Sequence, residues 1–204
     1  MMRRTVTVGG SWGVLCGIAN GWPVASTLVQ MTVPWVWIAA LVGYRLAEST
    51  RRSGLLGGVA LAAASVAYFG VGAIAGGLSG ESPFGGIRFL ILWTSIALVV
   101  GPIAGVIGRW LTTERTVLAV VLLATVSIAE PLALWAHIDH LDAHFAYFGV
   151  ALIGLTFPVV WFRSALRNAV KAVALTVALT YPTAVILEAG LVALRQISSP
   201  LRLV

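Results

Sequence analysis

The sequence has few charged residues. Only 10% of its 204 residues are Asp, Glu, Lys or Arg, whereas a soluble domain carries roughly 25%. So few charged side chains cannot cover the surface of a domain of this length, which excludes a water-soluble globule. Because 59% of the residues are hydrophobic and the mean hydropathy is +0.98, lipid must be the solvent for most of the chain.

Cysteine and the motifs of soluble enzymes are scarce as well. The single cysteine, Cys16, cannot form an intrachain disulfide, and its apolar surroundings indicate a buried, unreactive thiol. The sequence has no P-loop, no zincin histidine pair, no nucleophile elbow and no dinucleotide-binding glycine motif. Catalysis of the soluble kind therefore has no support, and a non-enzymatic role is favoured.

Long apolar runs are what the sequence has in abundance. A helix needs about 20 apolar residues to cross the hydrocarbon core of a bilayer, and turn and breaker residues between 20 and 34 divide the first long run into two. The fold class is therefore all-α, a polytopic transmembrane helix bundle that forms a single integral membrane domain over residues 1–204. Seven spans are predicted, at residues 6–27, 30–47, 53–77, 88–110, 115–136, 145–162 and 168–194.

The basic residues predict the orientation of these spans. Arg and Lys in short loops are retained on the cytoplasmic side. A cytoplasmic N-terminus puts ten of the 13 basic residues on that side: Arg3, Arg4, Arg45, Arg51, Arg52, Arg109, Arg115, Arg163, Arg167 and Lys171. Arg88, Arg195 and Arg202 are left outside. Six spans remain if the last segment does not cross, or if the first is a cleaved signal peptide.

Glycine recurs at every fourth position in the first span. Gly9, Gly13, Gly17 and Gly21 form one smooth stripe. In lipid, such small residues let helices pack closely. We expect this stripe to pack within the chain, and a homodimer face is the alternative.

Several stretches of small and aromatic residues resemble a known family. They are Val33-Pro34-Trp35-Val36-Trp37 leading to Gly43, Gly54-Leu55-Leu56-Gly57-Gly58 leading to Tyr68, Trp93 leading to Gly101-Pro102-Ile103-Ala104-Gly105, and Ala129-Glu130. Over about the first 135 residues the chain resembles a family of small multi-pass membrane proteins from actinobacteria, a domain of unknown function. The resemblance implies a polytopic membrane protein and supplies neither an activity nor a functional residue.

Two carboxyl groups lie inside predicted spans. Glu130 is in the fifth span and Glu188 is at a similar depth in the seventh, and Pro131 and Pro182 lie near them. Charged groups inside a span usually face a bundle interior or a cavity, and interrupted helices are where membrane proteins build polar sites. Each glutamate is either a binding group in the outer half of the membrane or a protonated acid that is hydrogen-bonded to a neighbouring helix.

Histidine is confined to one segment. His137, His140 and His144 are the only histidines of the chain. On a continuous helix they would share one face with Glu130, and imidazoles so spaced can bind zinc, iron or copper. The fifth span is already full-length before this segment, which favours a solvated loop. A polar loop, a metal or proton-responsive site, and direct contact with substrate all remain open.

Polar residues thus gather at the predicted outer face. Arg88 opens the fourth span there and either reaches lipid headgroups or binds an anionic ligand. Ligand pockets are mostly apolar with a few placed polar groups, so we predict an outward-facing pocket. Its candidate residues are Asn20, Gln30, Arg88, Glu130, Glu188, Trp22, Trp35 and Trp93, and His137, His140 and His144 are candidate metal ligands.

This pattern favours a multi-pass protein of the cell membrane that binds or transports a small molecule, alone or as the membrane subunit of a larger transporter. The first alternative is a metal-dependent hydrolase acting on a lipid-type substrate, with a divalent metal as its cofactor. The second is a structural or assembly role. The expected partners are membrane lipid, a small-molecule ligand and a subunit on the cytoplasmic side, and nucleic acid is not expected.

Overall fold

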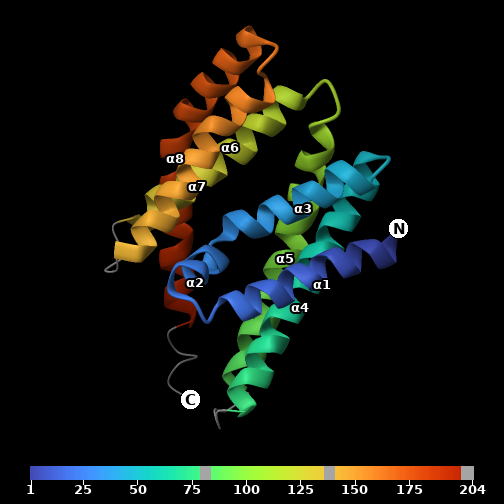
Figure 1. The fold of residues 1–204 in the computed structure, drawn as a ribbon, viewed down its shortest axis with the longest axis vertical. Coiled ribbons are helices and arrows are strands. Elements are labelled where there is room, and N and C mark those ends of the chain that lie inside the picture. The colour runs from blue at the N-terminus through green and yellow to red at the C-terminus, as the bar shows by residue number, and fades with distance from the viewer. Residues whose placement is uncertain (79–83, 136–140, 199–204) are drawn as a thin grey trace. The chain divides into compact units, whose positions relative to one another are not determined.

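The chain folds entirely as α-helices in the residues that the structure describes. A computed structural model describes residues 1–78, 84–135 and 141–198 (Figure 1). The helices are α1 (Met2–Ala19), α2 (Pro23–Gln30), α3 (Thr32–Leu46), α4 (Thr50–Leu78), α5 (Phe84–Trp110), α6 (Thr116–Leu134), α7 (Leu141–Trp161) and α8 (Leu166–Ser198). The prediction of an all-α fold is confirmed.

Five of these helices are long and apolar enough to cross a membrane. The qualifying stretches are Thr50–Ala75, Leu90–Trp110, Thr116–Leu134, Ala143–Trp161 and Leu166–Gly190. They coincide with the last five predicted spans. The pair α2 and α3 is bent by 61° and makes a sixth span if it is counted as one broken helix. The protein is therefore a multi-pass helical membrane protein with five to six candidate spans.

The first part of the chain departs from the predicted span boundaries. The expected span 6–27 is interrupted, because α1 ends at Ala19 and α2 begins at Pro23. Proline has no N–H and suits the first turn of a new helix. A second break follows at Met31, whose backbone is extended between α2 and α3. The 15 residues of α3 reach roughly 22 Å at 1.5 Å per residue, which is less than the thickness of a bilayer core.

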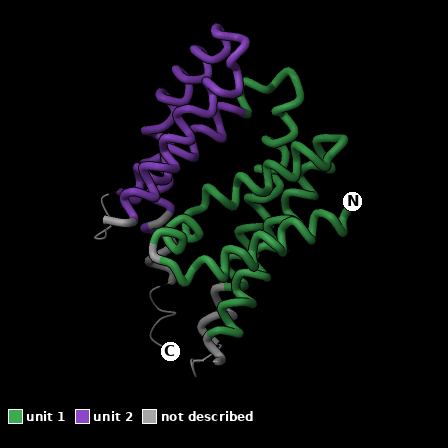
Figure 2. Tube along the Cα trace, viewed as in Figure 1, with its two compact units in different colours: residues 1–119 green, residues 120–204 purple. Residues whose placement is uncertain are grey.

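The chain divides into two compact units, which we call unit 1 (residues 1–119) and unit 2 (residues 120–204) (Figure 2). In unit 1, α4 and α5 form a hairpin, in which Gly54 lies against Val106 and Gly58 against Gly101. The helices α1 and α3 pack against this hairpin. In unit 2, α7 and α8 pack beside the main part of α6 (Figure 1).

Glycine sets the distance between the helices of unit 1. A Cβ atom added at Gly9 would overlap the carbonyl oxygen of Ala60, and one added at Gly13 would overlap that of Ala64. Because the partners advance together along both helices, α1 and α4 run parallel. The predicted packing of the glycine stripe within the chain is confirmed, except at Gly21, which lies in the turn after α1 and has no close contact with another helix.

Candidate functional site

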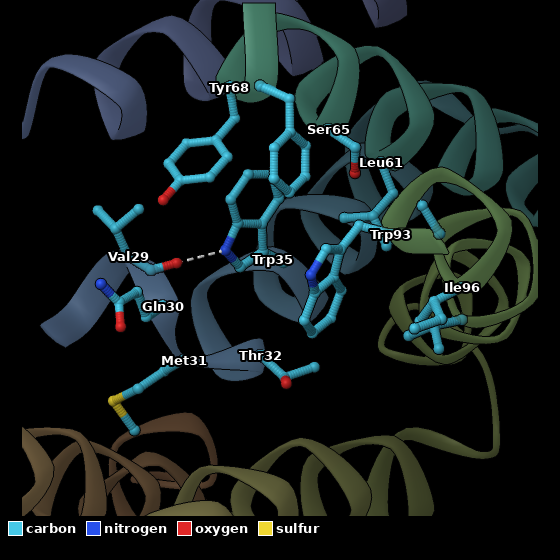
Figure 3. Close-up of a pocket in the computed structure, with 13 residues that line it drawn as sticks. Val29, Gln30, Met31, Thr32, Trp35, Leu61, Ser65, Tyr68, Trp93 and Ile96 are labelled. Atoms are coloured by element: carbon cyan, nitrogen blue, oxygen red, sulfur yellow. Dashed lines mark hydrogen bonds between the residues drawn. The ribbon is translucent and has the colours of Figure 1, made fainter. Parts of the chain in front are cut away.

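A cavity of about 320 Å³ lies within unit 1, beside the break between α2 and α3 (Figure 3). The break contributes Val29 to Thr32 together with Trp35. The central part of α4 contributes Leu61, Ser65, Tyr68 and Phe69, and α5 contributes Trp93, Ile96, Ala97 and Val100. We call this cavity the unit 1 pocket. Its walls come from four helices, so it exists only when unit 1 is folded.

A hydrogen bond across the helix break fixes one wall. The indole Nε1–H of Trp35 donates to the main-chain oxygen of Val29 at 2.8 Å (Figure 3). The carbonyls of the last helical turn lack the usual partners within their own helix, which makes them suitable acceptors for such a side chain. The bond ties the start of α3 to the end of α2 and holds the Trp35 ring in the pocket wall.

Aromatic rings make up much of the lining. Trp35 and Tyr68 meet edge to face, with centroids 5.5 Å apart and an interplanar angle of 85°. Tyr68 and Phe69 make a second edge-to-face pair, at 5.1 Å and 81°. Aromatic rings prefer this geometry because the positive edge of one ring meets the negative face of the other. Trp93 completes the aromatic lining from α5.

A small hydrogen-bonded group of polar side chains joins α1 to α2. The Ser26 hydroxyl donates to Asn20 Oδ1 at 3.0 Å. The Gln30 amide donates to Ser26 Oγ at 3.0 Å and to Asn20 Oδ1 at 3.5 Å. The structure therefore brings the predicted site residues Asn20 and Gln30 together, and Gln30 also lines the unit 1 pocket.

The predicted tryptophans differ in position. Trp35 and Trp93 line the unit 1 pocket. Trp22 lies in the turn before α2 with 67% of its surface exposed, and it is not part of that lining. Its position fits a membrane-interface anchor, since tryptophan is enriched at the boundary between lipid and water.

The predicted carboxyl groups both belong to unit 2. Glu130 of α6 is only 6% exposed, and Tyr147 of α7, which is also buried, lies close enough to interact with it electrostatically. Glu188 of α8 is exposed at the surface of the described chain. The two glutamates thus differ in burial, although the same role was predicted for both.

The remaining candidates are only partly described. His144 is the one predicted metal ligand within the described residues, and its ring meets that of Trp135 at 4.6 Å. His137, His140 and the side chain of Arg88 lie outside the described residues. Over the described part of the chain, no group of three or more His, Cys, Asp and Glu residues could hold a metal ion. The metal site at the histidines stays a prediction, and so does a single pocket that combines residues of both units.

Ten of the 13 lining residues of the unit 1 pocket were not among the predicted site residues, and three of these ten lie on α4 beside the aromatic wall. Ser65, Tyr68 and Phe69 follow one another along one side of α4. The signal for the first two was present, because a serine and a tyrosine interrupt an otherwise apolar span. Nothing in the sequence indicated that this side of α4 meets Trp35 and Trp93, since that depends on how the helices pack.

Comparison with protein families supports the resemblance noted in the sequence. Residues 3–193 match a family model described as "Family of unknown function (DUF6518)". The chain belongs to the DUF6518 family. The match extends well beyond the first 135 residues and includes most of unit 2 of this DUF6518 protein. Neither a curated protein nor a solved structure matches the chain. The actinobacterial origin that the resemblance implies stays an expectation.

Proposed function

We propose that this DUF6518 protein binds a small molecule in the unit 1 pocket, within the cell membrane. The observation that carries the proposal is the pocket itself, an aromatic-walled cavity at a broken helix pair. Binding sites for small molecules are mostly apolar cavities with a few polar groups. Membrane proteins that bind solutes often build such sites where a helix is interrupted.

The depth of the pocket supports the same proposal. Its residues on α4 and α5, such as Ser65 and Ala97, lie near the middle of those helices. Counted from Arg52 at the start of α4, Ser65 is roughly 20 Å along the helix axis. A ligand held there would sit deep in the bilayer. The proposal extends to transport for the same reason, because substrate sites near the midplane next to broken helices are typical of transporters.

We also propose seven crossings with a cytoplasmic N-terminus, in which α1 is the first crossing and the α2–α3 pair the second. The parallel course of α1 and α4 supports this count, because two helices that cross a membrane in the same direction have an odd number of crossings between them, and the α2–α3 pair is one crossing. The course of α3 agrees, because Trp35 meets Tyr68 while Val42 packs nearer the start of α4. The helix α3 therefore runs back along α4.

The basic residues of unit 1 support the orientation. The guanidinium of Arg109, at the end of α5, donates to the main-chain oxygen of Glu48 at 3.1 Å. This bond brings the end of α5 to the turn between α3 and α4, where Arg45, Arg51 and Arg52 also lie. An excess of arginine is typical of the cytoplasmic side of a membrane protein, so these four arginines support a cytoplasmic position for this end of unit 1.

The proposal also includes a partner subunit on the cytoplasmic side. This subunit would bind at Arg163, Arg167 and Lys171, which are exposed.

Cysteine labelling tests the proposed topology. In a Cys16→Ala background, Gly21→Cys and Glu48→Cys would each be exposed to a membrane-impermeant maleimide on intact cells. We expect labelling at position 21 and protection at position 48 until the membrane is permeabilised. Labelling of both positions on intact cells, or of position 48 alone, would contradict the topology.

Filling the pocket tests the proposed binding. Ala97 is buried and lines the cavity, whereas its neighbour Leu98 is exposed, so Ala97→Trp and Leu98→Trp place the same indole inside and outside the pocket. A ligand that binds only the folded protein raises its melting temperature. In a screen of neutral, anionic and cationic small molecules, we expect ligands that stabilise the wild type and Leu98→Trp but not Ala97→Trp. Ala97→Leu serves if the larger side chain prevents folding. If every stabilising compound acts equally on all variants, the proposal is wrong.

A further inference from the structure

The walls of the unit 1 pocket also indicate the kind of molecule that it would hold. We propose that the ligand is a neutral, planar ring compound with a hydrogen-bond-accepting oxygen, such as a carbonyl, at its edge. This inference rests on the proposed function, since it names the ligand class of the same site. Three properties of the pocket carry it: the lack of charge among its described lining residues, the arrangement of its rings and the position of its hydroxyl groups.

The lack of charge favours a neutral ligand. None of the 13 described residues that line the pocket is charged. Moving an ion from water into a low-dielectric interior is costly unless an opposite charge compensates it. A carboxylate or phosphate would find no cationic partner among these 13 residues. A cation could be held only by the faces of the aromatic rings, which makes a quaternary ammonium compound the competing ligand class.

The arrangement of the rings favours a flat ligand. The Trp35 and Phe69 rings each stand nearly perpendicular to that of Tyr68, so these side chains form right-angled corners with flat walls. The Trp35 ring is held in place by its hydrogen bond to Val29, and this bond also occupies its only polar atom. Trp35 therefore offers the pocket a fixed apolar surface, on which a planar ring can stack or meet edge to face.

The hydroxyl groups in the pocket wall favour a ligand that carries a hydrogen-bond acceptor. Ser65 and Tyr68 both line the pocket from α4, and Figure 3 shows their hydroxyl groups on opposite sides of the Trp35 ring, that of Tyr68 toward Val29 and that of Ser65 toward Leu61. Each hydroxyl can donate a hydrogen bond. The donors of Gln30 are directed toward Asn20 and Ser26. A ligand oxygen that accepts from the Ser65 hydroxyl is therefore the expected polar contact.

The size of the pocket limits the ligand to a compact molecule. Small-molecule sites range over roughly 300–1,000 Å³, and a cavity of about 320 Å³ is at the lower end. This volume suits a ring system of one to three rings and is too small for a whole phospholipid.

Four matched probes test the ligand class on the full chain purified in detergent. They are 2-acetylnaphthalene (neutral, planar, with a carbonyl), 2-naphthoate (anionic), trimethyl(2-naphthyl)ammonium (cationic) and 2-acetyldecalin (neutral, saturated). Binding is measured by equilibrium dialysis. The amount of probe bound by Ala97→Trp, in which the pocket is filled, is subtracted from the amount bound by the wild type, because it reports only partition of the probe into the detergent. We expect 2-acetylnaphthalene to bind about tenfold more tightly than each of the others.

The variants of this experiment separate the hydroxyl contact from general effects. Ser65→Ala removes one donor and should weaken binding of 2-acetylnaphthalene about three- to tenfold, which is the range for one hydrogen bond. Ser95→Ala is the matched control, because the Ser95 hydroxyl donates to the Ile91 carbonyl at 2.8 Å on the exposed side of α5, and it should leave binding unchanged. Equal effects of the two variants would contradict the assigned hydrogen bond.

The outcomes distinguish the ligand class from the proposed function. If the anionic, cationic or saturated probe binds as tightly as 2-acetylnaphthalene and Ala97→Trp abolishes this binding, the ligand class is wrong and the pocket still binds small molecules. If no probe distinguishes the wild type from Ala97→Trp, the ligand class is also wrong. The proposed function then stands only if the wider screen yields another ligand that Ala97→Trp excludes.

Discussion

The two units of the protein pack their helices in different ways. In unit 1, glycines on α1, α3, α4 and α5 bring backbones into direct contact, and Gly43 and Gly105 meet at one such point. In unit 2, alanines such as Ala129, Ala133 and Ala184 form the contact between α6 and α8. Among the described glycines of unit 2, those at positions 149 and 190 have no neighbour near their missing Cβ atoms, whereas Gly154 lies against Ser127 and Ile128 of α6. Contact between helix backbones at glycine is therefore more frequent in unit 1 than in unit 2.

The interiors of the two units differ as well. The buried polar residues of unit 1 are uncharged: Thr5, Ser53 and Ser65. Unit 2 buries the carboxyl group of Glu130 along with several hydroxyl groups. Ionisable groups within the membrane are expensive and are usually retained for function. The described lining of the unit 1 pocket is thus uncharged, whereas the buried acid Glu130 belongs to unit 2.

The largest effect is expected at the glycine contacts of unit 1. At Gly105, an added Cβ would overlap the carbonyl oxygen of Ser53, and a backbone atom cannot move aside as a side chain can. Gly105→Leu should therefore cost about 3 kcal/mol or more of folding free energy, seen as a large loss of thermal stability in detergent. Gly149→Leu in unit 2 has open space around it and should change stability by less than about 0.5 kcal/mol. Equal losses would remove the contrast between the units.

An intermediate effect is expected at the buried acid of unit 2. Glu130→Ala should destabilise the protein by about 1–3 kcal/mol, because it leaves buried polar neighbours without their partner, and Glu130→Gln should cost less. A double-mutant cycle with Tyr147→Phe should give a coupling energy of about 0.5–3 kcal/mol. The control is Tyr181→Phe, since Tyr181 is on the exposed surface of α8. A coupling energy to Tyr147 no larger than that to Tyr181 would refute the electrostatic interaction between Glu130 and Tyr147.

The smallest effect is expected at the pocket wall. Trp35→Phe keeps an aromatic ring but removes the hydrogen bond to Val29, so it should cost about 1 kcal/mol and weaken ligand binding by loosening the wall. Trp22→Phe changes an exposed ring and should have no measurable effect on either quantity. Chemical denaturation and the dialysis measurement check both variants. An unchanged Trp35→Phe protein would show that the bond does not stabilise the pocket.

The sequence alone was enough to predict that this is a multi-pass membrane protein and to locate its long helices. The helices α4 to α8 coincide with the last five predicted spans to within a few residues, because the bilayer itself requires long apolar runs with charged ends. The beginning of the chain was harder to predict. The expected hairpin between two full spans is instead a turn, the short helix α2 and a second break at Met31, because local breakers and packing against α4 decide where such helices end.

The sequence indicated only a few members of the candidate site. Gln30, Trp35 and Trp93 were proposed because polar and aromatic residues gather at the predicted outer face, and all three line the unit 1 pocket. Tyr68 and Phe69 escaped because their place depends on the edge-to-face contact with Trp35, which arises only when α3 returns along α4. A pattern along one helix cannot reveal the register between two.

The parallel contact between α1 and α4 has a consequence for biosynthesis. The helix α1 is translated before α4, yet its glycine surface packs against Ala60 and Ala64 of that later helix. At roughly 5–20 residues per second, α4 follows α1 by several seconds. The glycine surface of α1 therefore gains its partner only after α4 has been made.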